Sequence, residues 1–160
     1  MAVFLTVVIP TYNRKPILEK CLRALESQQY SPDSDIRGYE VVVVDDGSTD
    51  GTLDQLSDVT DPRLRIERMP RNSGKGAALR HGFRLVRSKY VAVHDADLEY
   101  DPGDFLRLLR PLRDGRADVV YGSRFIGGEE HRVLYFWHSM GNKALTLISN
   151  MFTNLNLTDM

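Results

Sequence analysis

Two uninterrupted runs of β-branched and apolar residues constrain the fold of this chain more than any other feature. Residues 3–9 read VFLTVVI, and residues 41–44 are four valines in a row. A strand with one face in water alternates apolar and polar side chains, whereas a strand covered on both faces does not. The two runs therefore predict buried strands of a parallel sheet with a layer of helices on each side.

Segments with helical spacing alternate with these strands. The segment from about Pro16 to Gln28 places one set of apolar side chains on a single face: Ile17, Leu18, Cys21, Leu22 and Leu25. Four more helices are predicted: one capped by Asp50 that contains Leu53 and Leu56, 76–86, one capped by Asp101 that runs through Leu112, and about 135–155. Three more strands are predicted, at 64–66, 90–94 and 119–121. This order predicts an α/β protein with a Rossmann-like, mostly parallel sheet.

Composition excludes several classes of protein. The 160 residues suffice for one domain with a core, and the net charge of −1 argues against a nucleic-acid partner. The single cysteine, Cys21, rules out an internal disulfide. Residues 1–5 lack the basic region of a signal peptide, and no apolar stretch has the length of a membrane span. We therefore expect a cytoplasmic protein.

Polar residues follow four of the predicted strands, at the sheet edge where ligands bind in such folds. They lie at 11–13, 45–48, 95–97 and 122–124. Each position by itself has two interpretations. Asp45 is either a turn residue or an acceptor for base and ribose donors, and Arg124 is either an ion-pair partner or a phosphate donor. The convergence of four such loops at one edge favours a ligand site.

Asp95 and Asp97 point to the kind of ligand. Two carboxylates at the end of a buried strand are costly unless a positive charge compensates them. A divalent cation that also holds a diphosphate would do so. The nearby Gly74-Lys75-Gly76 is not a Walker phosphate-binding loop. Met69 stands where that motif needs a glycine, and Gly76 stands where it needs Ser or Thr.

Five segments in this order and spacing resemble the family 2 glycosyltransferases of the GT-A fold. They are VVIPTYNR (7–14), VVVVDDGSTDGT (41–52), NSGKGAALRHG (72–82), HDADLEYDP (94–102) and YGSRF (121–125). The resemblance is closest to the branch of dolichyl- and polyprenyl-phosphate sugar synthases. One departure is Arg14, where many members of the family carry Glu.

The resemblance implies a role for each residue that matches these motifs. The residues that would hold the nucleotide sugar are Pro10, Tyr12, Asn13, Asp45, Lys75 and Asp95. Lys75 has a second interpretation, as a solvated lysine at a helix start. Asp97 and Glu99 would bind the metal, Mg²⁺ or Mn²⁺, and Asp95, Asp97, Arg124 and Asp159 would serve catalysis. Arg124 and Arg132 would contact the acceptor phosphate.

The resemblance also implies the reaction, an inverting transfer of a sugar from a UDP- or GDP-linked donor to a polyprenyl phosphate. A lipid phosphate needs no general base, because its second pKa is roughly 6; a hydroxyl acceptor would need one, and Asp159 is the candidate. Two alternatives remain, transfer to a glycan hydroxyl and a nucleotide-sugar-binding module without turnover.

The resemblance also implies how the chain is organised. We expect residues 1–160 to be one catalytic domain truncated at its C-terminus, at the cytoplasmic face of a membrane in the full-length protein. The apolar face of the last predicted helix, with Leu145, Ile148 and Phe152, is expected to favour self-association. The segment 127–130 is expected to be a mobile loop.

Overall fold

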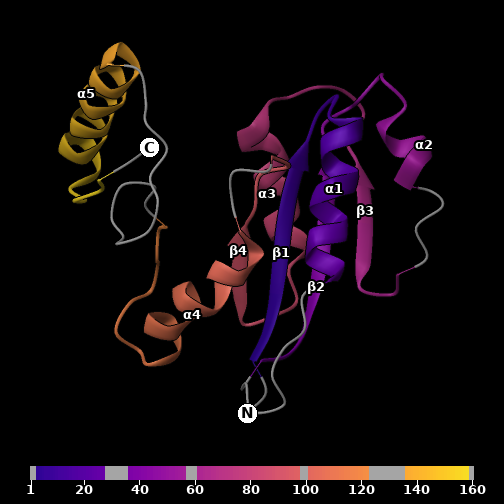
Figure 1. Ribbon diagram of the computed structural model, residues 1–160, viewed down its shortest axis with the longest axis horizontal. Helices are drawn as coiled ribbons and strands as arrows, with labels where there is room; N and C mark the ends of the chain where they lie inside the picture. The colour runs from indigo at the N-terminus through magenta and orange to yellow at the C-terminus, as the bar shows by residue number, and fades with distance from the viewer. Residues whose placement is uncertain (1–2, 28–35, 57–60, 98–100, 123–135, 159–160) are drawn as a thin grey trace. The chain divides into compact units, whose positions relative to one another are not determined.

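Four parallel strands form the centre of the first part of the chain (Figure 1). They are β1 (Val3–Thr11), β2 (Ile36–Asp45), β3 (Leu64–Arg68) and β4 (Tyr90–Val93), and their order in the sheet is β3-β2-β1-β4. All three pairings are parallel. The predicted α/β class and parallel sheet are therefore confirmed, and β2 begins five residues before the predicted valine run.

The computed structural model describes residues 3–27, 36–56, 61–97, 101–122 and 136–158. It divides into two compact units, Met1–Arg107 and Leu108–Met160, and each is described by itself. The helices are α1 (Lys15–Glu26), α2 (Thr52–Leu56), α3 (Lys75–Leu85), the 3₁₀ turn η1 (Pro102–Asp104), α4 (Phe105–Arg113) and α5 (Phe136–Thr153).

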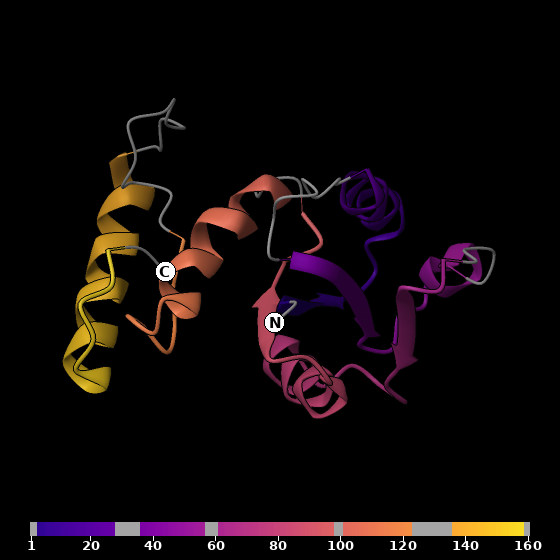
Figure 2. The ribbon, with the colours of Figure 1, turned by 90° about the horizontal axis from the view of Figure 1, so that it is seen from below.

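Helices cover both faces of the sheet, as the apolar runs predict. Figure 2 shows α1 and α3 on opposite sides of the strands. On the α3 side, Val8, Val42 and Val44 form a buried cluster with Ala78. On the α1 side, Leu18, Cys21 and Leu25 are buried. Both faces of the central strands are thus removed from water, which accounts for the absence of alternation in their sequences.

Two predicted caps are present at the starts of helical segments. The Asp50 carboxylate accepts hydrogen bonds from the Thr52 backbone N–H (3.0 Å) and from the Thr52 hydroxyl. The Asp101 carboxylate accepts the Gly103 N–H at 2.8 Å at the start of η1. Each carboxylate satisfies a backbone donor that has no partner inside its own helix.

The strand predicted at 119–121 is wrong. These residues form neither strand nor helix, and the side chains of Val119 and Tyr121 are exposed. Three apolar residues do not specify a strand by themselves, because a strand is stable only where a neighbouring strand pairs with it. The segment 127–130, expected to be a loop, lies outside the described residues.

Helix α5 carries its large apolar side chains on one half of its circumference and its polar side chains on the other. Leu145, Ile148 and Phe152, predicted to share a face, are all exposed, and so are Trp137 and Met151. Within the part of the chain that the structure describes, no helix combines the length and hydropathy of a membrane span. Self-association through α5 stays a prediction.

Close packing of α3 on the sheet depends on the absence of a side chain at Gly82. A Cβ at this position would lie 2.5 Å from Val8 Cγ1 and 3.2 Å from Val44 Cγ2. Gly82 is buried, so the added methyl group has no open space to enter.

We therefore predict that Gly82→Ala destabilises the protein by about 1–2 kcal/mol, because overpacking outweighs the better helix propensity of alanine. Gly76→Ala in the same helix is the matched control, since nothing lies within 4 Å of its added Cβ. That variant should be neutral or slightly more stable. Urea denaturation of both variants measures the difference, and equal stabilities would contradict the packing argument.

Candidate functional site

The carboxyl ends of β1, β2 and β3 are joined by backbone hydrogen bonds just beyond the sheet. The Asp46 N–H donates to the Thr11 carbonyl at 2.8 Å, and the Met69 N–H donates to the Asp45 carbonyl at 2.8 Å. The loops that follow these strands therefore start from fixed positions at one edge. This is the edge at which parallel α/β sheets bind ligands.

Asn13 ties the loop after β1 to the loop after β2. Its backbone N–H donates to Ser48 Oγ at 2.9 Å, and its side-chain Oδ1 accepts the Thr49 N–H at 2.9 Å. Asn13 has φ of 51°, a left-handed conformation that asparagine tolerates better than most residues. The neighbouring Tyr12 is 41% exposed, so its ring is accessible beside this link.

Asp45 and Thr11 are paired in the register of β1 and β2 and are both buried. The Ser48 N–H lies 3.1 and 3.3 Å from the two carboxylate oxygens of Asp45. A carboxylate offers about four lone-pair positions, so this donor leaves capacity for others. Among the described residues, the Thr11 hydroxyl has no hydrogen-bond partner. Pro10 is buried within β1.

Asp46 is a site residue that the sequence reasoning missed. It is 3% exposed, and its two carboxylate oxygens accept the Ser73 N–H at 2.9 Å and the Gly74 N–H at 2.7 Å. Its position directly after a strand predicts a turn residue or a ligand contact, and neither predicts a bond to a residue 27 positions away. A signal existed, because a second carboxylate directly after a buried strand needs donors of its own.

Lys75 and Asp95, both predicted site residues, are brought together. The Lys75 Nζ lies 2.6 Å from Asp95 Oδ2, and the two side chains are 59% and 27% exposed. Lys75 is the first residue of α3, and Asp95 follows β4. Lys75 is thus a largely exposed lysine at a helix start, as its second interpretation has it, and it also pairs with Asp95. An accessible ammonium can bind an anionic group of a ligand, and the carboxylate beside it can bind a cation or a hydrogen-bond donor.

The negative charge of Asp97 acts on buried groups of α1 and β4. Burial, and to a lesser extent Asp97, raises the pKa of the Cys21 thiol to about 11. Burial lowers the pKa of His94, while Asp97 and Asp95 oppose that shift. The His94 ring also packs edge-on against Phe105, with ring centroids 5.5 Å apart. The Asp97 charge therefore acts on two buried side chains, Cys21 and His94.

The carboxylates at this edge fit a hard divalent cation. Asp97 carries carboxylate oxygens of the kind Mg²⁺ and Mn²⁺ prefer, whereas Asp95 is bonded to Lys75. Within the described ranges, no group of three His, Cys, Asp or Glu side chains forms a cage for a metal. Mg²⁺ commonly binds through one or two carboxylates and substrate phosphates, and two carboxylates suffice for that arrangement.

Four predicted site residues lie outside the described residues. They are Glu99, Arg124, Arg132 and Asp159. Their roles in metal binding, phosphate binding and acceptor activation stay predictions.

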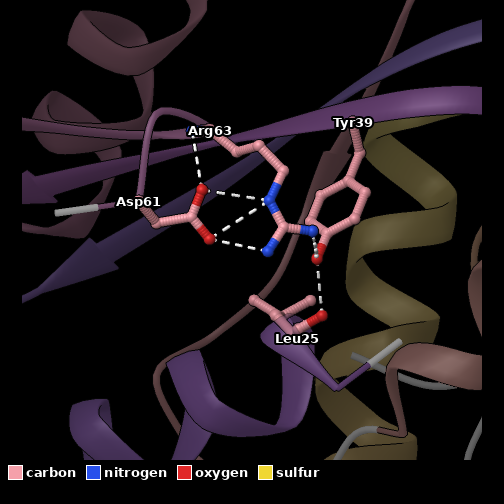
Figure 3. Close-up of polar contacts among 4 residues, drawn as sticks. All are labelled: Leu25, Tyr39, Asp61 and Arg63. Carbon is pink, nitrogen blue, oxygen red and sulfur yellow. Dashed lines mark hydrogen bonds and ion pairs between the residues drawn. The ribbon is translucent and has the colours of Figure 1, made fainter. Parts of the chain in front are cut away.

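A cavity of about 540 Å³ lies between α1 and the β2–β3 side of the sheet. Figure 3 shows the polar network in its wall: the Arg63 guanidinium bonds to Asp61 at 2.6 Å and to the Tyr39 hydroxyl at 2.8 Å. The Tyr39 hydroxyl donates to the Leu25 carbonyl at 2.6 Å.

Comparison with known proteins shows that this chain is similar to glycosyltransferases. The family described as Glycosyl transferase family 2 matches residues 6–157. The chain is 33% identical, over 97% of its length, to the low-salt glycan biosynthesis hexosyltransferase Agl6 of Haloferax volcanii. It is 27% identical, over 91% of its length, to the dolichol-phosphate mannosyltransferase of Pyrococcus furiosus. The chain spans only 36% and 40% of the lengths of these two relatives.

Two solved structures of similar fold hold a nucleotide sugar. The mannosyltransferase PcManGT from Pyrobaculum calidifontis, in complex with GDP-Man and Mn²⁺, has a TM-score of 0.54 and 34% identity. The match covers 64% of this chain and 30% of that one. S. aureus TarS 1-349 in complex with UDP-GlcNAc has a TM-score of 0.58 and 27% identity, over 71% of this chain and 32% of that one.

The buried imidazole of His94 predicts a pH dependence of stability. An unfolded histidine has a pKa near 6.5, and burial lowers this value in the folded protein. Below pH 6.5 the unfolded chain therefore binds more protons than the folded one, so the free energy of unfolding falls as the pH falls. His94→Gln should remove this contribution. Urea denaturation between pH 5 and 7.5 tests it, and an unchanged slope in the variant would contradict the assignment.

Proposed function

Because this chain belongs to glycosyl transferase family 2, we propose that it carries the donor site of an enzyme that moves a sugar from a nucleotide sugar to a polyprenyl phosphate. The observation that carries the proposal is the pairing of Lys75 with Asp95 at 2.6 Å, beside Asp97, at the carboxyl edge of the sheet. This arrangement offers a cation for a diphosphate and carboxylates for a metal and sugar hydroxyls.

The nucleoside part is assigned to the ends of β1 and β2. Tyr12 presents an accessible ring that can stack on a base, next to Pro10 and Asn13. Asp45 retains acceptor capacity for base or ribose donors, and the unpartnered Thr11 hydroxyl lies opposite it in the register. A ligand bond to that hydroxyl would remove the cost of a buried polar group without a partner.

The diphosphate and the donor sugar are assigned to the end of β4. Asp97, with Glu99, would hold Mg²⁺ or Mn²⁺, and Asp95 would face the ribose or the donor sugar. When bound, the ion supplies charge stabilisation to the leaving nucleoside diphosphate. The Lys75 ammonium would weaken its bond to Asp95 and contact the diphosphate. PcManGT, a relative of this chain, is known in complex with GDP-Man and Mn²⁺, which supports this assignment.

The acceptor is assigned from chemistry and from the relatives. One phosphate oxygen of the lipid would attack the anomeric carbon while the bond to the nucleoside diphosphate breaks on the opposite face, which inverts the carbon. The attacking phosphate is already ionised, so arginines such as Arg124 and Arg132 need only orient it. Relatives include a dolichol-phosphate mannosyltransferase and a dodecaprenyl-phosphate galacturonate synthase. These acceptors are lipids, which would place the reaction at a membrane surface.

A transfer assay tests the proposal. The chain, or the longer protein that contains it, is incubated with Mn²⁺, a polyprenyl phosphate in detergent and GDP- or UDP-linked sugars. The expected product is a glycosylated lipid phosphate whose anomeric configuration, read by NMR, is opposite to that of the donor. A parallel reaction replaces the lipid phosphate with a glycan, and transfer only to its hydroxyl would favour the alternative acceptor. Nucleotide binding without any product in either reaction would favour a binding module.

A substitution series tests the metal assignment. Asp97→Asn should weaken Mn²⁺-dependent binding of a nucleoside diphosphate about tenfold or more, because a charged ligand of the ion is lost. Binding of a nucleoside monophosphate without metal should change little. Asp101→Asn is the control, because Asp101 caps η1 and should affect stability but not nucleotide affinity. Calorimetric titration measures both, and equal metal dependence in all three proteins would refute the role of Asp97.

A further inference from the structure

The loop between β3 and α3 is hydrogen-bonded to the loop that follows β2. The Asp46 carboxylate accepts the backbone N–H groups of Ser73 (2.9 Å) and Gly74 (2.7 Å). Asp46 is 3% exposed, so the acceptor of both bonds is buried, whereas the donor residues Ser73 and Gly74 are exposed. We call Asp46, Ser73 and Gly74 the carboxylate clasp.

A glycine brings the two loops close enough for the carboxylate clasp to form. Gly47 has φ of +75°, and a Cβ there would lie 2.7 Å from the Arg71 carbonyl carbon and 2.8 Å from the Asn72 nitrogen. Backbone therefore packs directly on backbone at this point. Any side chain at position 47 would have to push residues 71–72 away.

The carboxylate clasp is next in the chain to Lys75, which supplies the ammonium of the candidate site. The Gly74 carbonyl accepts the N–H groups of Ala77 (2.9 Å) and Ala78 (3.1 Å), which starts the first turn of α3. Lys75 is the next residue, and its Nζ lies 2.6 Å from Asp95. The position of Gly74 thus fixes both the start of the helix and the origin of the lysine side chain.

We propose that Asp46 is a positioning residue for the diphosphate subsite. It does not contact the ligand; it holds Gly74 so that the Lys75 ammonium stands beside Asp95, where the diphosphate of the donor would bind. The inference rests on the proposed function, since it names the residue that sets one of its contacts. Lys75 has a long flexible stem, and a fixed origin limits the positions that its charge can occupy.

The test separates the diphosphate contact from the rest of the nucleotide. The quantity measured is the dissociation constant of the nucleoside monophosphate divided by that of the diphosphate. It is measured for GMP and GDP, and for UMP and UDP, in the presence of Mn²⁺. Asp46→Asn should reduce this ratio about tenfold, because an amide cannot accept both N–H groups and the loop is released. Lys75→Met should reduce it by a similar factor.

The double variant decides whether Asp46 acts through Lys75. If it does, adding Asp46→Asn to Lys75→Met changes the ratio no further, whereas independent effects would multiply. Asp50→Asn is the matched control, because Asp50 lies in the same loop and also accepts a backbone N–H, but at α2. It should lower stability and leave the ratio unchanged.

A second variant displaces the same loop sterically. Gly47→Ala should push residues 71–72 away and reduce the ratio without altering any charge. Circular dichroism identifies folded variants, and either Asp46→Asn or Gly47→Ala suffices for the test. Amide hydrogen exchange at Ser73 and Gly74 should accelerate in Asp46→Asn. If both variants leave the loop closed to exchange, the carboxylate clasp does not hold it and the proposal is overturned.

The outcomes keep this proposal distinct from the proposed function. A wild-type chain that binds neither GDP nor UDP would refute the donor site itself. A wild-type chain that binds a diphosphate, with the same ratio in Asp46→Asn, would refute only the positioning role. Multiplying effects of Asp46→Asn and Lys75→Met would also refute it.

Discussion

The parallel pairing of β1 with β2 is the interaction on which the rest of the described site depends. The register from Val7–Val41 to Thr11–Asp45 aligns the carboxyl ends of both strands. The valines between these ends are buried on both faces, and burial of this much apolar surface stabilises the alignment strongly. A shift by one residue would turn core side chains toward the wrong face, so the register is well specified.

That alignment determines what the polar residues beyond the strands can do. Thr11 and Asp45 end beside each other, and the next residues form a continuous set of hydrogen bonds from Asn13 through Ser48 to Asp45. Asp46 extends this set to the loop before α3. Carboxylates that would be costly alone are thereby satisfied by backbone donors, which leaves the edge preorganised.

The two aspartates at the end of β2, Asp45 and Asp46, and the aspartates after β4 have different surroundings. Asp45 and Asp46 are buried and bonded to backbone N–H groups. Asp95 is partly exposed and paired with Lys75. Buried carboxylates with fixed donors shape the site, whereas accessible charges can exchange partners when a charged ligand arrives.

The sequence by itself determined the layered fold and the presence of polar residues at the carboxyl edge of the sheet. Uninterrupted apolar runs are local signals, and the strand-end position of Asp95 and Asp97 follows directly from them. Only the tertiary structure decided which polar residues meet. The bonds from Asp46 to Ser73 and from Lys75 to Asp95 join residues 27 and 20 positions apart, so they depend on where whole loops are placed. The same reason explains the wrong strand at 119–121, because strand pairing is a non-local interaction that three apolar residues cannot encode.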